Sequence, residues 1–218
     1  MTLELNRIYN MDCLEGMRQI EDKSVDLVLT DPPYGIKLTN EKLQTRKQLA
    51  DPIDYGHFDW DMEAPPQECF LNIYRISKNQ VIFGGNYFAL FPTPCWIVWD
   101  KDNSGDFADA ELAWTSFTTP VRIFKWRWNG MLQQDMAHKE TRIHPTQKPV
   151  PLFEWILKNY AKTGHIICDP FVGSGSVCVA AARLGLPFIG FEKEQSYFDA
   201  AEKRIKKAQG QGKIEAWF

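Results

Sequence analysis

Hydrophobic and polar positions along the chain form a succession of short blocks, each with the length of one strand or one helix. Apolar runs of the kind that form buried strands cover residues 6–10, 25–29, 80–83, 165–168 and 187–191. Segments with apolar residues three and four positions apart, as on one face of a helix, cover residues 13–20, 65–78, 151–161, 176–184 and 195–208. This alternation predicts an α/β fold.

The middle of the chain follows a different pattern. Residues 96–99, 112–116 and 121–128 predict three strands, with a turn at 102–105 after the first of them. Their spacing favours an antiparallel edge with hairpin-like connections. A short helix is expected over 87–91, and the proline that follows ends it.

Two polar stretches predict loops. Residues 129–143 lack a clear period, and so do residues 36–64. A long irregular segment inside a compact domain is usually a lid, a binding loop or a disordered segment, and we expect 36–64 to be a loop over a pocket. The 218 residues suffice for one domain with a sizeable core, and no repeat or linker divides them.

Composition narrows the class of protein. A hydrophobic content of 44% and a charged content of 24% are ordinary for a soluble globular protein. We expect no membrane span, because no apolar run approaches roughly 18 residues, and no signal peptide, because the N-terminus lacks its basic and apolar regions. The five cysteines form no C-x-x-C pair, which favours free thiols in a reducing cytoplasm over zinc or disulfides.

The net charge of −3 argues against nonspecific coating of nucleic acid, but one segment is locally basic. Between residues 120 and 150 there are six basic and two acidic residues, interspersed with Phe124, Trp126 and Trp128. This pattern fits a nucleic-acid-binding face and an edge strand with solvated charges equally well.

The first candidate site follows the apolar run 25–29. Asp31 is followed by Pro32 and Pro33, which cannot donate to a sheet ladder, and then by Tyr34. The carboxylate of Asp31 and the carbonyl of Pro32 can each accept one N–H of the exocyclic amine of a nucleobase. The ring of Tyr34 can stack on that base, which contributes roughly 1–3 kcal/mol. Taken alone, a strand followed by two prolines is usually only a turn.

The second candidate site follows the run 165–168. Asp169 leads to Gly173 and Gly175, whose missing Cβ atoms let the backbone approach a ligand. Glu192 comes 17 residues after Gly175, close to the spacing of a carboxylate that binds ribose hydroxyls. Cys178 occupies the place of the third glycine of a dinucleotide fingerprint. A ligand with ribose and no phosphate, such as S-adenosylmethionine, is therefore favoured.

These motifs, Asp-Pro-Pro-Tyr at 31–34 and Asp-Pro-Phe-Val-Gly-Ser-Gly at 169–175, resemble the two signature motifs of the DNA amino-methyltransferases. The catalytic motif comes first, and His-Pro-Thr-Gln-Lys-Pro at 144–149 precedes the cofactor motif. This order resembles the beta class of DNA N6-adenine methyltransferases. The resemblance implies a circularly permuted, Rossmann-like S-adenosylmethionine-dependent methyltransferase fold, with a mixed, mostly parallel sheet and helices on both faces.

The resemblance implies transfer of a methyl group from S-adenosylmethionine to N6 of an adenine flipped out of duplex DNA. N4-cytosine methylation is the nearest alternative, although that group more often has Ser where Asp31 stands. Methylation of RNA or of protein glutamine, and a catalytically silent DNA-binding module, also remain open. The implied setting is the cytoplasm of a bacterium or a phage-infected cell. The recognition sequence, a cognate restriction endonuclease and a homodimer cannot be read from the chain.

Roles for individual residues follow from the resemblance. The catalytic residues would be Asp31, Pro32, Pro33 and Tyr34. The cofactor-binding residues would be Asp12, Cys13, Asp31, Thr146, Gln147, Lys148, Asp169, Phe171, Gly173, Ser174, Gly175, Glu192 and Lys193. The DNA contacts would be Lys37, Arg122, Lys125, Arg127, Lys139 and Arg142, within a lid or DNA-binding loop at 36–64 and a small target-recognition region at about 100–143.

Within the cofactor set, Asp12 would accept from the adenine amine of the cofactor and Glu192 would hold the ribose hydroxyls. Residues 146–148 would close over the methionine end. Each of these acids and bases also has an ordinary structural interpretation. Asp12 can cap a helix, Glu192 can be a surface acid and Lys148 a solvated charge.

Overall fold

The computed structural model describes residues 3–36, 63–103, 108–129 and 132–211. The strands are β1 (Arg7–Tyr9), β2 (Val25–Thr30), β3 (Ser77–Phe83), β4 (Trp96–Asp100), β5 (Ala110–Thr115), β6 (Arg122–Lys125), β7 (Trp128–Asn129), β8 (Leu132–Gln133), β9 (Ile167–Asp169) and β10 (Phe188–Phe191). The helices are α1 (Cys13–Arg18), α3 (Gln67–Ile76), α4 (Val150–Tyr160), α5 (Ser176–Arg183) and α6 (Gln195–Gly210), with a 3-10 turn, η1 (Gly85–Tyr87).

Eight of these strands form one sheet in the order β1-β10-β9-β2-β3-β5-β4-β6, and β7 pairs with β8 in a separate ribbon. Neighbours from β1 to β3 are parallel, whereas β5 is antiparallel to both β3 and β4. The expected mixed, mostly parallel sheet is therefore confirmed.

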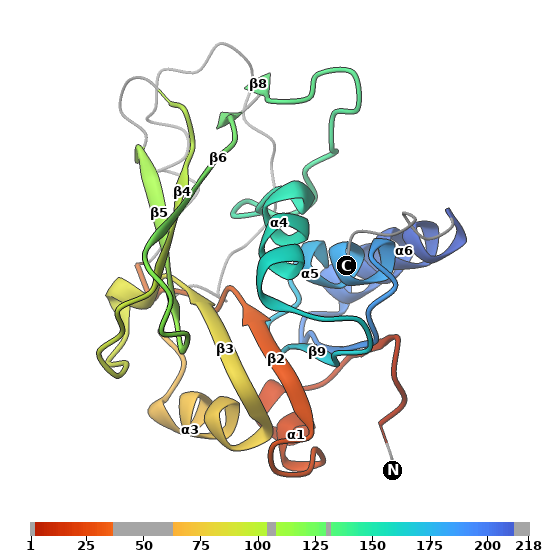
Figure 1. Cartoon of the computed structure of the whole chain (residues 1–218). Helices are drawn as coiled ribbons and strands as arrows, with labels where there is room; N and C mark the ends of the chain where they lie inside the picture. The colour runs from red at the N-terminus through yellow and green to blue at the C-terminus, as the bar shows by residue number, and fades with distance from the viewer. Residues whose placement is uncertain (1–2, 37–62, 104–107, 130–131, 212–218) are drawn as a thin grey trace.

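Helices cover both faces of this sheet. Leu27 and Leu29 of β2 pack in one apolar cluster with α4, α5 and α6, while Val28 packs in a second cluster with α1 and α3. Figure 1 shows α1 and α3 together below β2 and β3, and α4, α5 and α6 grouped to the right of them. The central strand β2 is apolar except for Asp26 and Thr30, because it is buried on both sides.

Three local expectations about the middle of the chain were wrong. The third strand of the expected antiparallel edge, β6, runs parallel to β4, because it follows β5 in the opposite direction and then pairs on the far side of β4. The helix expected over 87–91 is absent, since Phe88 is extended (φ −119°, ψ 151°) and a five-residue helix has few internal bonds. The loop expected over 129–143 contains β8.

The carboxyl ends of β9 and β2 lie side by side, with Val28 opposite Cys168. From β9 the chain continues through α5 to β10 on one side, and from β2 it continues through α3 to β3 on the other. This is the switch point of the sheet, the edge at which open α/β sheets bind their ligands. Within the described ranges, no helix has the length and apolar character needed to cross a bilayer.

Candidate active site

The two sequence motifs meet at this switch point. Thr30, the last residue of β2, donates its hydroxyl hydrogen to Oδ1 of Asp169 at 2.7 Å. Asp31 follows Thr30 directly, and Asp169 opens the glycine turn. The edge of β2 that carries the Asp-Pro-Pro-Tyr turn is thus tied to the edge of β9 that carries the glycine turn.

Both carboxylate oxygens of Asp31 have partners. Oδ1 accepts the phenolic hydrogen of Tyr34 at 2.8 Å, and Oδ2 accepts from the ammonium group of Lys148. The same ammonium group lies 3.1 Å from the hydroxyl oxygen of Tyr34. Pro32 is buried and Pro33 is half-buried. Two of the four residues assigned to catalysis, Asp31 and Tyr34, therefore contact one buried cation.

A second carboxylate holds that cation from the other side. Oε2 of Glu111, on β5, lies 3.0 Å from Nζ of Lys148, and the other oxygen of Glu111 is paired with Lys101. The Lys148 side chain is only 4% exposed. Asp31, Lys148, Glu111 and Lys101 thus form a row of alternating charges. Sequence reasoning missed Glu111 and Lys101, because nothing local marks one acid on a strand as facing a distant lysine.

The charge states in this row follow from burial and from the neighbours. Burial raises the pKa of Asp31, and the nearby Glu111 adds to this, although Lys148 acts against it. Burial would also raise the pKa of Glu111, but the attraction of Lys148 and Lys101 outweighs it and lowers the value to about 2. Burial would lower the pKa of Lys148, yet its two carboxylate partners raise it. Lys148 is therefore an ammonium ion.

The ring of Tyr34 is held by aromatic neighbours. It stacks on Tyr87 with centroids 4.9 Å apart and an interplanar angle of 14°, and meets Phe88 edge-on. Gly84 lies beneath the ring with φ +67°, and an added Cβ there would come within 2.2 Å of a ring carbon. Burial raises the pKa of Tyr34, so its hydroxyl stays protonated and can donate. A base that stacks on Tyr34 must use the face opposite Tyr87 or displace Tyr87.

On the cofactor side, Asp169 is buried and accepts the amide hydrogen of Phe171 at 3.1 Å as well as the hydroxyl of Thr30. Burial raises the pKa of Asp169 to about 7. Phe171 is half-buried against the α1–α3 side of the core.

The glycine turn leaves space for a ligand at one position. Gly173 has φ +50°, and a Cβ added there would meet nothing closer than 3.9 Å, from the ring of His144. Gly175 has φ +78° and is the N-cap of α5. Ser174 between them is buried, with its hydroxyl 3.1 Å from that of Ser176.

Glu192 faces this turn from the end of β10. One of its carboxylate oxygens accepts the amide hydrogen of Gly173 at 2.8 Å, and the other accepts that of Glu194 at 2.9 Å. Burial raises the pKa of Glu192. Lys193 is exposed, and its carbonyl oxygen accepts from the side chain of Asn10, a residue that sequence reasoning missed.

Asp12 and Cys13 lie at the start of α1. The Asp12 carboxylate caps the helix by accepting the amide hydrogen of Leu14 at 2.8 Å. The structural interpretation of Asp12 as a cap is therefore realised, although each carboxylate oxygen has a further lone pair for a ligand. Cys13 is buried, with its sulfur 3.9 Å from that of Cys69.

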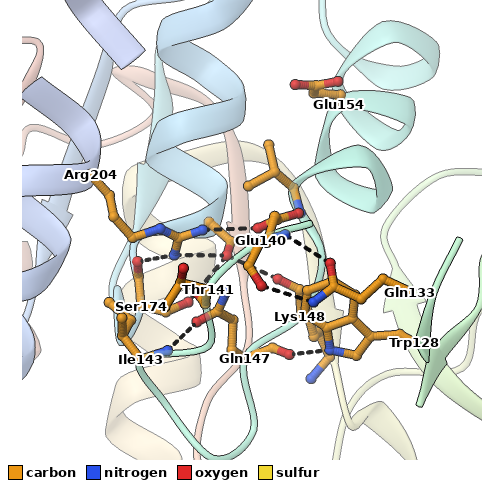
Figure 2. A network of polar contacts seen from close by, with 12 residues as sticks. Trp128, Gln133, Glu140, Thr141, Ile143, Gln147, Lys148, Glu154, Ser174 and Arg204 are labelled. Atoms are coloured by element: carbon orange, nitrogen blue, oxygen red, sulfur yellow. Dashed lines mark hydrogen bonds and ion pairs between the residues drawn. The ribbon is translucent and has the colours of Figure 1, made fainter. Parts of the chain in front are cut away.

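Of the segment 146–148, only Lys148 reaches the catalytic turn. The buried Gln147 bonds within its own segment, since its side-chain oxygen accepts from the amide of Ile143 at 2.9 Å (Figure 2). The Thr146 hydroxyl lies 3.1 Å from Nδ1 of His144. His144 is itself buried, and burial together with Lys148 lowers its pKa to about 3.

Arg204 on α6 connects the cofactor turn to the middle of the chain (Figure 2). Its guanidinium group donates to the carbonyl oxygen of Ser174 and pairs with Glu140 at 3.0 Å. The second oxygen of Glu140 accepts the amide hydrogen of Val150 at the start of α4. Sequence reasoning missed this network, because an arginine on an amphipathic helix is usually a solvated charge.

Five of the six predicted DNA contacts lie within the described residues. Lys125 and Arg127 share Asp102 as a partner, and Arg122 is exposed on β6. Arg142 lies over the ring of Trp128, 4.8 Å from its centroid. The exposed Lys139 lies three residues before Arg142.

Lys37 and most of the expected loop 36–64 lie outside the described residues. Within the described part of the chain, no group of three or more His, Cys, Asp or Glu side chains could hold a metal ion.

Comparison with known proteins places this site in context. A family model described as DNA methylase (N6_N4_Mtase) matches residues 118–203. The type II methyltransferase M.HinfI of Haemophilus influenzae is 28% identical over 93% of this chain and 68% of its own length. The putative methylase YubD of Escherichia coli K12 is 26% identical over 98% of both chains. The chain is therefore similar to DNA methyltransferases of the N6/N4 family over most of its length.

Solved methyltransferase structures share the fold of this chain. The M1.HpyAVI–SAM complex superposes with a TM-score of 0.56 and 24% identity, covering 91% of this chain and 98% of that one. PvuII DNA methyltransferase, which is cytosine-N4-specific, gives a TM-score of 0.58 at 16% identity, covering 96% and 93%. The Rossmann-like fold of S-adenosylmethionine-dependent methyltransferases is therefore confirmed, and S-adenosylmethionine is the cofactor that this family uses.

Proposed function

We propose that the chain is a site-specific DNA methyltransferase that transfers a methyl group from S-adenosylmethionine to N6 of an adenine flipped out of duplex DNA. The observation that carries the proposal is the contact between the ends of β2 and β9, through Thr30 and Asp169 at 2.7 Å. It brings a carboxylate suited to an amine next to a glycine turn suited to the methyl donor. The order of the motifs supports the beta class, as does Asp31 where Ser is more frequent in N4-cytosine enzymes.

The turn at 31–34 would bind the target amine. Asp31 accepts one N–H, the carbonyl oxygen of Pro32 accepts the other, and Tyr34 stacks on the base. The bound cofactor supplies a methyl group on a sulfonium, which is already a good leaving group. Alignment is therefore the main task of the protein, and it contributes up to about 7–11 kcal/mol in favourable cases.

Proton handling needs no strong base. Asp31 has to be ionised when the amine binds, and the ammonium group of Lys148 favours that state. The amine nitrogen becomes acidic only after it has been alkylated, and its proton can then pass to Asp31 and on to solvent. Extrusion of the base from the duplex costs a few kcal/mol, which contacts to the flipped base must offset.

The glycine turn would bind the donor. Gly173 leaves room beside the backbone, and Glu192 would accept from the ribose hydroxyls. Both oxygens of Glu192 already accept one backbone N–H each, but each has a further lone pair. Asp12 would accept from the adenine amine of the cofactor in the same way.

N4-cytosine methylation is the second candidate. The structural similarity to the cytosine-N4-specific PvuII enzyme favours it, because the two amines require the same acceptor geometry. The chemistry of Asp31, Pro32 and Tyr34 is compatible with either base. Only the identity of the modified base separates these two functions.

Expression in a methylation-free bacterial host, followed by nucleoside analysis and mapping of modified bases, tests the proposal. We expect N6-methyladenine at one short sequence, and no modification from the Asp31→Ala variant, which should still bind S-adenosylmethionine. N4-methylcytosine would replace the adenine assignment. Absence of labelled methyl transfer to duplex DNA by the purified protein would refute the function, as would retained transfer by Asp31→Ala.

The same map bears on the biological setting. The proposal implies a bacterial or phage-encoded enzyme that acts on double-stranded DNA in the cytoplasm. Methylation confined to one short sequence is the pattern that a cognate restriction endonuclease would require.

A further inference from the structure

Lys148 lies between two partly buried carboxylates that come from different parts of the sheet. Asp31 follows β2 and Glu111 belongs to β5, and the Lys148 ammonium group contacts both, the second at 3.0 Å. The ammonium group also lies 5.4 Å from the ring centroid of Tyr34 and 5.0 Å from that of Phe83. No solvated surface surrounds this cation, so its charge must be balanced by these neighbours.

In this arrangement the ammonium group of Lys148 occupies the position required by a target amine. It donates to Oδ2 of Asp31 beside the ring of Tyr34, while Oδ1 accepts from the Tyr34 hydroxyl. A target amine that binds Oδ2 of Asp31 from this same position displaces the lysine from it. A buried ammonium ion deprived of its carboxylate is strongly disfavoured, so Lys148 can release Asp31 only if another anion holds it.

We propose that Glu111 is a positioning residue for methyl transfer, which keeps Lys148 paired when Asp31 turns to the target amine. This inference rests on the proposed function. Lys101 binds the other oxygen of Glu111 and fixes the carboxylate behind Lys148. Lys101 itself lies 5.0 Å from the ring centroid of Trp99, which limits its movement. No covalent step is involved, since the exchange only redistributes hydrogen bonds among groups already present.

Charge balance explains why Glu111 is needed. Asp31 and Glu111 carry two negative charges, and Lys148 and Lys101 carry two positive ones. With glutamine at position 111, Asp31 becomes the only carboxylate that Lys148 contacts among the described residues. The lysine then remains on Asp31 and competes with the target amine.

The test compares Glu111→Gln with wild type in the full chain on a duplex that contains the methylated site. Single-turnover methyl transfer should fall roughly 10- to 100-fold, as expected when a reacting group is misplaced. The affinity for S-adenosylmethionine should stay within about twofold, because the ion pairs of Glu111 are with Lys148 and Lys101 and not with the glycine turn. Glu111→Asp keeps the charge and should recover part of the rate.

Glu154→Gln is the matched control. Glu154 is a half-buried carboxylate on α4, 15% exposed, that pairs with Arg183 at 3.1 Å and lies apart from the Lys148 cluster (Figure 2). Its loss should lower stability without lowering the transfer rate. If each glutamine variant loses transfer rate only in proportion to its fall in melting temperature, the role of Glu111 is merely structural. That result would overturn the inference.

The pH dependence of the single-turnover rate is a second measurement, which a loss of packing alone would not change. The groups that face Asp31 are Lys148, Tyr34, Glu111 and, from β9, Asp169. Removal of the Glu111 charge lowers the pKa of Asp31, so the acidic limb of the single-turnover profile should move to lower pH. If the acidic limb of Glu111→Gln does not move and its rate stays within twofold of wild type, this inference is overturned and the proposed function is not. A wild-type chain that transfers no methyl group to DNA overturns the proposed function, and this inference with it.

Discussion

Single side chains in this site differ mainly in whether they keep their charge. Glu111 stays ionised between two lysines, whereas Asp169 is buried with hydrogen-bond donors and contacts no cation among the described residues. Asp31 is intermediate, because burial and Lys148 oppose each other. The same residue type therefore has a different tendency to hold a proton at the two neighbouring strand ends.

The contrast between Tyr34→Phe and Tyr34→Ala tests what the tyrosine contributes. The ring provides the stacking surface and fills the space above Gly84, whereas the hydroxyl donates to Asp31. Tyr34→Phe should therefore lose less than about tenfold in single-turnover rate, close to one hydrogen bond. Tyr34→Ala should lose far more of the single-turnover rate. It should also lose the fluorescence increase that a 2-aminopurine at the target position gives when it is flipped out. Equal losses in both variants would assign the role to the hydroxyl instead.

Asp169 should make the stability of the ligand-free protein depend on pH. The pKa of Asp169 is raised from about 4 in the unfolded chain to about 7 in the folded one. Its contribution to the unfolding free energy is therefore complete below pH 4 and is lost as the pH rises through 7. Asp169→Asn keeps an oxygen that accepts from Thr30 and Phe171 but carries no charge. The unfolding free energy of the variant, relative to that of wild type, should rise between pH 4 and 7 by up to roughly 4 kcal/mol.

Urea unfolding of Asp169→Asn and wild type across this range measures the difference. Other acids titrate in both proteins, so their contributions cancel. A difference that is constant with pH would mean that the Asp169 carboxyl is not held neutral by the fold.

At the scale of elements, strands that end in a functional residue were the most predictable. β2 and β9 are apolar runs followed by an aspartate and a proline, and the sequence marks both their burial and their ends. The pairing of β6 was not predictable, because an exposed strand can pair on either side of a hairpin and distant packing decides which. The roles of Glu111 and Arg204 were not predictable for a similar reason, since their partners are distant in sequence.

Arg204 and Glu140 provide a prediction about how elements are joined. The pair links α6, the glycine turn and the start of α4, and both side chains are about one-fifth exposed. Arg204→Met leaves the Glu140 carboxylate without its cation and should cost about 3 kcal/mol of unfolding free energy. Adding Glu140→Gln should recover part of that loss, because no uncompensated charge remains.

The exposed pair of Arg7 and Glu4 is the control for this experiment. Its side chains are 62% and 68% exposed, so solvent screens the pair and Arg7→Met should leave the unfolding free energy almost unchanged. Unfolding by urea gives all of these values. If Arg204→Met costs no more than Arg7→Met, the network does not hold the elements together.

For the whole molecule, spatial order matters more than chain order. The site depends on β9 lying beside β2, and this adjacency does not require the segment 144–211 to follow the segment 3–133. The ends of the described chain also lie close together, since the Gln209 side chain donates to the carbonyl oxygen of Asn6 at 3.0 Å. The fold should therefore tolerate a different starting point.

A permuted chain tests this directly. Joining residue 211 to residue 3 by a short glycine-serine linker, and opening the chain between His138 and Lys139, would place the glycine turn before the Asp-Pro-Pro-Tyr turn. The opened position is exposed, and the Gln133–Glu140 hydrogen bonds beside it persist without covalent continuity. We expect a cooperative unfolding transition and S-adenosylmethionine binding within about tenfold of the natural order.

A second permutant opened inside β2, between Leu27 and Val28, should not fold, because it splits the central strand on which both turns depend. Equal behaviour of the two permutants would contradict the view that the β9–β2 contact organises the site.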